Sequence, residues 1–467
     1  MTQKAVHLTK IEKPIIFNEV APTMLTDQTM AERKQKVLAN MAAEGFDALV
    51  IYADKEHGGN FEYLTGFIPR FEEGLLVLDS SGNATLVLGN ENLKMANYSR
   101  IDNVLVHSPL FSLPNQPMDN EARLETIFET IGLAQKAKIG IVGWKMFTTK
   151  EADNAAYFDV PYFIVEALMA CKKTEAILEN ATHLFIRGDR GARTQNNANE
   201  IAHYEYGANL ASSSMLQAMD AVGLEVSEAM LGNILNAEGQ ANTVVTIAAT
   251  GQRFEYANFY PTHKVVKLGD PLSLTTAYKG GLSSRTGFVV ENQAQLPVEQ
   301  EDYLDRVAKP YYQAVVAWLE TIKIGMSGTA LYEAIEAAFP KATYHWHLNP
   351  GHLVSDEEWM ASPIYQGSNE ILKSGMILQI DIIPSVAGYT GVSAEECVAL
   401  ADAALKQQIQ TAYPDLWERI ETRRAYIKEV LNISLSDDLL PMSNTVAYLR
   451  PFFLAKDSAF QCENKES

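Results

Sequence analysis

The sequence predicts an α+β protein of two domains, a mixed α/β domain over residues 1–180 and a second domain over residues 181–467 whose arrangement occurs twice. The chain has 467 residues, 47% of them hydrophobic, which is enough for two cores. Helical and strand patterns alternate in its first part. Its second part repeats a helix pair followed by strands, which indicates two related halves.

The first domain is predicted to open with an amphipathic helix. Residues 31–45 (AERKQKVLANMAAEG) place apolar side chains on one helical face and end in Gly45, a residue that commonly terminates helices. Two apolar runs around a Ser-Gly-Asn turn predict a hairpin at 74–89. The pattern continues with predicted strands at 46–53, 104–108 and 138–143 and a helix near 121–138.

A polar stretch over residues 172–200, rich in glycine and asparagine, marks the boundary between the domains, and we place it at 180/181. A long helical pattern follows at 201–222, and Ser227 then precedes a shorter one as a capping residue would. The same pair recurs over 305–325 and 326–339. Strand-like segments follow each pair, so we expect two halves of similar construction.

Charge and cysteine content exclude several classes of protein. The formal net charge is -20, from 58 acidic and 38 basic residues, which argues against a nucleic-acid partner or an anionic membrane surface. The start of the chain lacks an apolar run of signal length, and no segment approaches ~18 apolar residues, so we expect a cytoplasmic protein. Three widely spaced cysteines predict neither a disulfide framework nor a cysteine-rich metal site.

The stretch from His345 to Leu400 carries the main candidates for chemistry. It sets His352, Asp381 and Glu395 into otherwise apolar strands. Ionisable groups buried in strands are costly unless something pairs with them. A single metal held by one imidazole and two carboxylates is the simplest arrangement that would explain all three residues.

Several segments together resemble one superfamily. AERKQKVLANMAAEGFDALVIYA and NFEYLTGF are similar to the start of the non-catalytic domain of the Xaa-Pro peptidase and creatinase branch. ATGQRFEYANFYPTH, KLGDPLSLTTAYKGGLSSRTGFVV, LNPGHLV, LKSGMILQIDIIP and SAEECVAL then follow in the order found in the pita-bread fold of methionine aminopeptidases, Xaa-Pro peptidases and creatine amidinohydrolase. The resemblance implies a creatinase-like N-terminal domain before a pita-bread domain, hydrolysis of a peptide or small C–N bond, and a homodimer.

The resemblance implies an incomplete metal site. The metal histidine of the family falls on His352, and its two metal glutamates fall on Asp381 and Glu395. Its two metal aspartates fall on Ser273 and Ser284, and the interval 271–286 contains no Asp or Glu at all. Two divalent cations need several carboxylates to offset their repulsion, so we expect either one metal, Mn, Zn or Fe, or none.

The resemblance also assigns catalytic and substrate-binding positions. A histidine of the family falls on Asn258, which cannot shuttle a proton at neutral pH. A second falls near Glu358 or Trp359. His352, Glu358 and Asn258 are therefore the catalytic candidates. The candidates for substrate binding are Tyr260, Arg285 and Trp359.

Two functions stay open at this stage. The first is a hydrolase of a peptide or of a small amide- or amidine-like compound, in which His352 is the acid–base group; creatine amidinohydrolase is the family precedent for work without metal. The second is a catalytically inactive homologue that binds a ligand or a partner. A rival metal pair, His345 and His347, would share one face of a strand. The segment from 402 to 467 has no assigned motif.

Overall fold

The computed structural model describes residues 4–119, 121–252, 258 and 260–463, and it divides the chain into two compact units. The N-terminal unit is residues 25–194, and the C-terminal unit combines residues 1–24 with 195–467. The division therefore falls later than the expected 180/181. Strand β7 (Ile177–Asn180) pairs in parallel with β6 (Lys138–Val142), and the chain after it stays with the N-terminal unit, because the Tyr63 hydroxyl donates to the Ala192 carbonyl at 2.7 Å and Arg193 donates to Asn60 Oδ1 at 2.8 Å.

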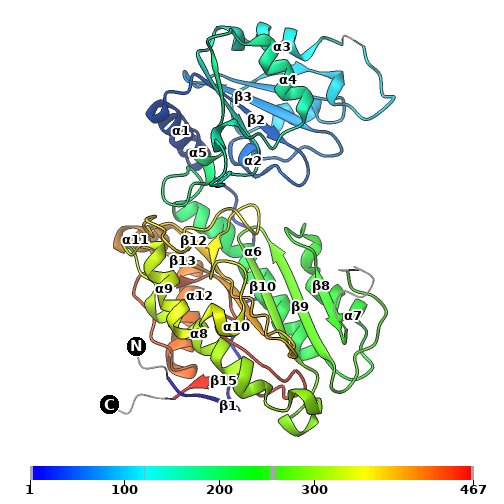
Figure 1. Cartoon of the computed structure of the whole chain (residues 1–467), viewed down its shortest axis with the longest axis vertical. Coiled ribbons are helices and arrows are strands. Elements are labelled where there is room, and N and C mark those ends of the chain that lie inside the picture. Colours follow the sequence, from blue (N-terminus) through cyan, green and yellow to red (C-terminus); the bar gives the residue numbers. More distant parts are fainter. Residues whose placement is uncertain (1–3, 120, 253–257, 259, 464–467) are drawn as a thin grey trace. The chain divides into compact units, whose positions relative to one another are not determined.

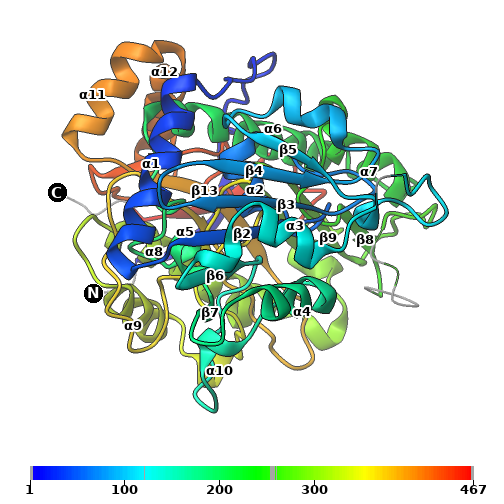
Figure 2. The same ribbon diagram turned by 90° about the horizontal axis from the view of Figure 1, so that it is seen from above.

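The N-terminal unit is built on a six-stranded mixed sheet in the order β5-β4-β3-β2-β6-β7 (Figure 2). The hairpin expected at 74–89 is formed by β3 and β4. The helix expected near 121–138 is shorter than predicted, because α3 ends at Thr130 and Gly132 has a φ of 89°. The other elements are α1 (Asp27–Glu44), β2 (Ala48–Ala53), α2 (Gly59–Thr65), β3 (Gly74–Asp79), β4 (Ala84–Leu88), β5 (Val104–His107), α3 (Leu124–Thr130), α4 (Tyr162–Cys171) and α5 (His183–Ile186).

The C-terminal unit holds a seven-stranded sheet in the order β11-β12-β13-β10-β9-β8, with β14 beside β13 (Figure 1). Its strands are β8 (Ile247–Thr250), β9 (Pro271–Tyr278), β10 (Gly281–Phe288), β11 (His352–Leu353), β12 (Ile377–Ile380), β13 (Ser393–Leu400) and β14 (Leu439–Pro441), and a separate pair is formed by β1 (Val6–Lys10) and β15 (Ser458–Cys462). Its helices are α6 (Ala198–Ala221), α7 (Glu228–Leu235), α8 (Lys309–Thr321), α9 (Gly328–Ala338), α10 (Lys341–Tyr344), α11 (Ala403–Ala412) and α12 (Pro414–Ala425).

The two expected halves of this unit are confirmed. The second helix of each pair begins after a serine cap: Ser227 accepts from the Met230 N–H, and Ser327 accepts from the Ala330 N–H. Each capping serine also forms an antiparallel bridge, Ser227 with Val265 and Ser327 with Ile371. The halves join where β10 pairs with β13. In the described part of the chain, no helix is long and apolar enough to cross a membrane.

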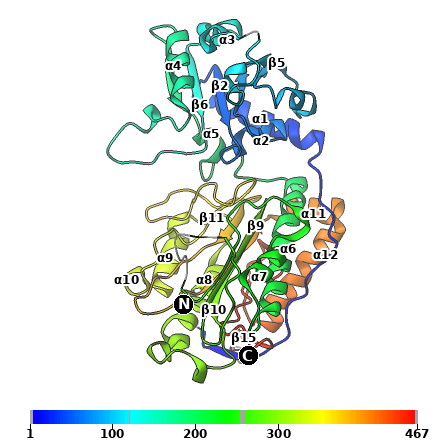
Figure 3. The same cartoon turned by 90° about the vertical axis from the view of Figure 1, so that its right-hand side faces the viewer.

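The chain after residue 402 packs on the C-terminal unit. α11 lies against α6 (Figure 3), and β15 pairs with β1 near both ends of the chain (Figure 1). A buried ion-pair network fixes α12: Glu205 of α6 accepts from Arg419 at 2.9 and 2.6 Å and from Arg423 at 2.7 Å. Burial raises the pKa of Glu205, but the two guanidinium groups outweigh it and hold this pKa below its ordinary value.

Substitution of Glu205 by Gln is expected to destabilise the C-terminal unit by about 3–5 kcal/mol, because it leaves buried guanidinium charge without its carboxylate. Urea unfolding followed by tryptophan fluorescence measures the effect. The control is Lys309→Ala, which removes a more exposed ion pair with Asp305 within one helical turn and should cost less than about 0.5 kcal/mol. Equal losses in the two variants would contradict this prediction.

Candidate active site

The register of four strands gathers the predicted site residues on one face of the sheet. Residues paired directly across antiparallel strands point to the same side. Ser284 of β10 is opposite Thr275 on β9 and Glu395 on β13. His352 is opposite Gln379 on β12, which is opposite Cys397 on β13, two residues from Glu395. Asp381 continues the alternation from Gln379 just beyond the end of β12.

Five hydroxyl groups on this face bond to one another. Ser273 Oγ is 3.0 Å from Thr286 Oγ1, and Thr275 Oγ1 is 3.0 Å from Ser284 Oγ. Ser393 Oγ joins the pairs, at 3.1 Å from Ser284 Oγ and 3.2 Å from Thr286 Oγ1. All five side chains are buried. Ser273 and Ser284, where the resemblance leads us to expect metal aspartates, are therefore part of a neutral hydrogen-bonded cluster of five hydroxyls, which we call the hydroxyl network.

His352 is fully buried beside two carboxylates. Its Nε2 lies 3.1 Å from Glu358 Oε1 and 3.6 Å from Asp381 Oδ2. Trp359 stacks on its ring, with centroids 4.1 Å apart and planes inclined by 28°. Nδ1 is 3.1 Å from the Leu353 carbonyl, which can only accept, so Nδ1 carries a proton and the ring is oriented.

Two buried polar atoms in this cluster are unsatisfied. Among the described residues, neither Nε2 of His352 nor Oδ1 of Asp381 has a hydrogen-bond partner. Nε2 is within ion-pair distance of Glu358, but the approach is not aligned for a hydrogen bond. Such atoms need an explanation, and a substrate or water that binds between them is one.

The charges of the cluster shift each other's protonation. Burial lowers the pKa of His352, but Glu358, then Asp381 and the Leu353 carbonyl, outweigh burial and raise this pKa above its ordinary value. Burial and the nearby Glu358 raise the pKa of Asp381 to about 6, against the opposing effect of His352. The protonated form of the His352 imidazole is thus favoured, and the ionised form of the Asp381 carboxyl is disfavoured.

Arg285 lies on the other face of the sheet. It is opposite Ala394, and its guanidinium contacts the buried Glu396 at 2.6 Å and the carbonyls of Thr445 and Tyr448 at 2.7 and 2.9 Å. We expected Arg285 in the substrate pocket. Strand alternation turns it away from the face that carries Ser284, and its N–H groups are used in a structural contact.

The remaining predicted residues are more scattered. Asn258 and Tyr260 are both exposed, and the Tyr260 N–H donates to Asn258 Oδ1 at 3.1 Å. Glu395 is partly buried at the register position opposite Ser284. His345 and His347 are exposed and do not form a strand, since His345 ends α10 with a φ of 52°; the premise of the rival metal pair is wrong.

The residues present do not fit the metal centre that the resemblance implies. Two of its expected carboxylate positions hold neutral serine hydroxyls, and these bond to threonine hydroxyls: Ser273 to Thr286 and Ser284 to Thr275. Within the residues that the structure describes, no group of three or more His, Cys, Asp or Glu side chains could hold a metal ion. His352, Asp381 and Glu395 share a face without forming such a group.

Sequence reasoning missed several participants. Thr275, Thr286 and Ser393 complete the hydroxyl network, and Thr275 and Thr286 follow the selected serines by two residues, a spacing that could have revealed them. The buried Tyr311 of α8 accepts from the Ala394 N–H at 2.8 Å next to Glu395. Its pKa is raised by burial and then by Glu395, so it stays a neutral phenol.

Two family models match the chain. Creatinase/Prolidase N-terminal domain matches residues 33–146, and Metallopeptidase family M24 matches residues 170–402. Both fold expectations, a creatinase-like domain followed by a pita-bread domain, are confirmed. No curated protein sequence matches the chain.

Solved structures share this fold at low sequence identity. A prolidase from Thermococcus sibiricus is 20% identical with a TM-score of 0.61, over 81% of this chain and 95% of that one. The Xaa-Pro dipeptidase from Bacillus anthracis is 16% identical with a TM-score of 0.60, over 80% and 96%. The X-Pro aminopeptidase from Thermotoga maritima is 16% identical with a TM-score of 0.58, over 79% and 95%. These likenesses show the fold.

The Asp381→Asn variant is expected to melt at a higher temperature than the unsubstituted protein. The difference between the two melting temperatures should grow as pH rises from 4 to 7. The carboxyl has an ordinary pKa of 3.8 and a folded pKa of about 6, so its ionisation disfavours the folded state across this window. Two pKa units correspond to roughly 3 kcal/mol at most. Melting curves of both proteins at each pH test it, and a difference that stays constant with pH would refute it.

Proposed function

We propose that this chain, which joins a creatinase/prolidase N-terminal domain to a domain of metallopeptidase family M24, hydrolyses a small C–N bond with His352 as its acid–base group and without a metal pair. The carrying observation is the pair of unsatisfied buried atoms, Nε2 of His352 and Oδ1 of Asp381. The substrate class is a short peptide, such as one with a bond before proline, or a small amide or amidine.

The proposed mechanism starts from the protonated ring. The Leu353 carbonyl fixes the proton on Nδ1, and the raised pKa favours a second proton on Nε2. The lack of an aligned partner leaves that N–H free to donate to the leaving nitrogen. A protonated amine is a far better leaving group than an amide anion, so this step lowers the barrier to C–N cleavage.

Glu358 is the proposed base for water. As water attacks the carbon, its oxygen forms the new C–O bond, its proton passes to the Glu358 carboxylate, and the Nε2 proton passes to nitrogen as the C–N bond breaks. The 3.1 Å between Glu358 Oε1 and Nε2 then lets the proton return to the imidazole. Asp381 is 3.6 Å from the same nitrogen and stabilises its positive charge. Protons and atoms balance over the cycle.

The acidic character of the site bears on substrate choice. Glu358 and Asp381 bring negative charge to a single imidazole, and the stacked Trp359 offers an aromatic face. A substrate with a positive charge next to its scissile bond would be favoured by both features. This reasoning extends to peptides with a free amino group and to amidines.

The His352→Ala variant is expected to lose turnover by about a thousandfold or more, since it removes the acid for the leaving group. The assay is liquid chromatography of products from a panel of Xaa-Pro dipeptides, creatine and small amidines. His347→Ala, at an exposed histidine five residues away, is the matched control and should keep full activity. Activity that survives in His352→Ala would exclude the mechanism, and no turnover of any panel member by the original chain would favour the inactive homologue instead.

A second prediction concerns the hydroxyl network. The double variant Ser273→Asp/Ser284→Asp is expected to have a lower melting temperature in EDTA, because both added carboxylates are buried, and to recover on addition of Mn²⁺. The original chain should melt at the same temperature in EDTA and in Mn²⁺.

The control is Ser273→Asn/Ser284→Asn, which matches the aspartates in size without their charge and should not respond to Mn²⁺. Differential scanning fluorimetry supplies the melting temperatures, and metal analysis of each purified protein supplies the metal content. A marked stabilisation of the original chain by Mn²⁺ would contradict the proposal of metal independence.

A further inference from the structure

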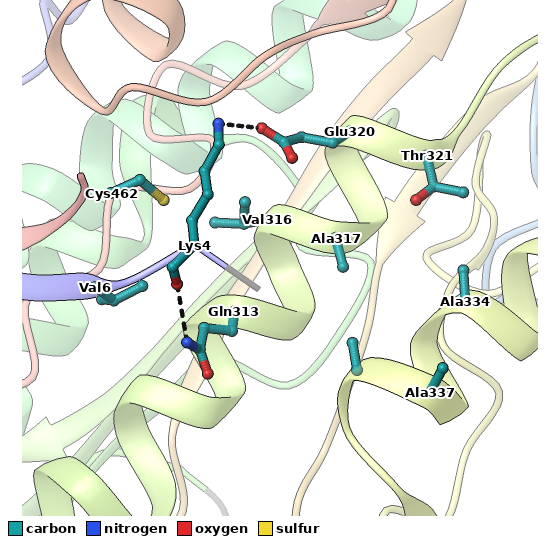
Figure 4. Close-up of a pocket in the computed structure, with 11 residues that line it drawn as sticks. Lys4, Val6, Gln313, Val316, Ala317, Glu320, Thr321, Ala334, Ala337 and Cys462 are labelled. Atoms are coloured by element: carbon teal, nitrogen blue, oxygen red, sulfur yellow. Dashed lines mark hydrogen bonds and ion pairs between the residues drawn. The ribbon is translucent and has the colours of Figure 1, made fainter. Parts of the chain in front are cut away.

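A cavity of about 380 Å³ lies in the C-terminal unit and shares no lining residue with the candidate active site. α8 and α9 line it on one side, and Lys4, Val6 of β1 and Cys462 of β15 line it on the other (Figure 4). Both β1 and β15 lie outside the two segments that match family models. The cavity is therefore built partly from segments outside those two matches.

One part of the cavity is apolar because the facing helices carry short side chains. Ala317 of α8 and Ala334, Ala337 and Ala338 of α9 all line it. Facing helices normally fill the space between them by interdigitation of larger side chains. Four methyl groups leave that space open and make this part of the lining apolar.

The polar part of the cavity is the ion pair between Lys4 and Glu320, in which one carboxylate oxygen of Glu320 can still accept a hydrogen bond. Lys4 Nζ is 2.5 Å from Glu320 Oε1 and also donates to the Asn432 carbonyl at 2.9 Å. The Ser434 N–H donates to the same Oε1 at 2.9 Å. Among the described residues, both of these partners contact Glu320 through Oε1, so Oε2 is left as an acceptor. The Lys4 ammonium already has two partners, the Glu320 carboxylate and the Asn432 carbonyl.

Thr321 adds a second polar group. It follows Glu320 at the end of α8 and lines the same end of the cavity (Figure 4). Its Oγ1 is buried, and in the described part of the chain it has no hydrogen-bond partner. A buried hydroxyl without a partner costs about 1–3 kcal/mol, which a ligand group would recover.

The cavity is suited to binding rather than to covalent chemistry. Its one thiol, Cys462, is buried, and burial raises the pKa of this thiol to about 11, with Lys4 opposing. A thiol in that state is a poor nucleophile.

We propose that this cavity binds a small primary amine with a compact apolar body. The ammonium group would donate to Glu320 Oε2 and to the Thr321 hydroxyl, and the apolar body would lie on the four alanines. An anion is disfavoured, because Lys4 is already paired and Glu320 would repel it. The volume falls within the range of about 300–1,000 Å³ typical of small-molecule sites. The site does not depend on the proposed hydrolase activity.

The test uses isothermal titration with benzylamine, benzyl alcohol and benzoate, which share one apolar body and differ in the polar group. We expect saturable binding of benzylamine, weaker binding of the alcohol, and the weakest binding of benzoate. Benzoate that binds as well as benzylamine, or no saturable binding of benzylamine up to about 10 mM, would overturn the proposal.

Three variants locate the binding. Ala334→Leu fills the cavity and should weaken benzylamine at least about tenfold, whereas Ala330→Leu, at an exposed position of the same helix outside the cavity, should leave it unchanged. Thr321→Val removes the hydroxyl at constant shape. It should raise the melting temperature of the free protein and also weaken benzylamine several-fold. Equal effects of Ala334→Leu and Ala330→Leu, or a lower melting temperature of Thr321→Val with undiminished binding, would refute the assignment.

Discussion

The pairing of β10 with β13 is the contact on which the rest of the C-terminal unit depends. It joins the two halves, and its register sets Ser284 opposite Glu395 on one face. On the other face it brings Arg285 and Glu396 to 2.6 Å in a fully buried ion pair. The same ion pair reaches the chain after residue 402 through Thr445 and Tyr448. A shift of one residue would exchange the two faces and bury charge where the hydroxyl network lies.

The fold could be predicted from the sequence largely because its signals are local. Ser227 and Ser327 are N-caps next to the helices that they predict, and the hairpin at 74–89 is predicted by the turn between its two strands. The pairing of β1 with β15 could not be foreseen, since it joins strands more than 400 residues apart with no sequence pattern that specifies the partner. The late end of the N-terminal unit has the same origin, because it depends on contacts such as the hydrogen bond from Tyr63 to the Ala192 carbonyl, 129 residues away.

The candidate site was predictable only in part, because the sequence does not show directly which way each side chain points. His352 and Glu358 are six residues apart in the sequence, and the chain between them turns back so that Glu358 lies beside the imidazole. Arg285 was chosen for its position next to Ser284, but neighbours in a strand point to opposite faces, and the same rule explains why Glu396 rather than Glu395 became its partner. The hydroxyl network needs three strands in register, which a single sequence does not fix.

The serines and the protonated histidine are two parts of one electrostatic arrangement. Carboxylates gathered on one buried face repel each other unless a cation lies among them, and Asp381 already has a pKa raised to about 6 with only one imidazole nearby. Two further aspartates at 273 and 284 would add charge that His352 alone could not balance. Neutral hydroxyls that satisfy one another remove that demand. In such a site the positive charge of His352 faces Glu358 and Asp381, and in the proposed mechanism the proton that carries this charge is the one donated as the C–N bond breaks.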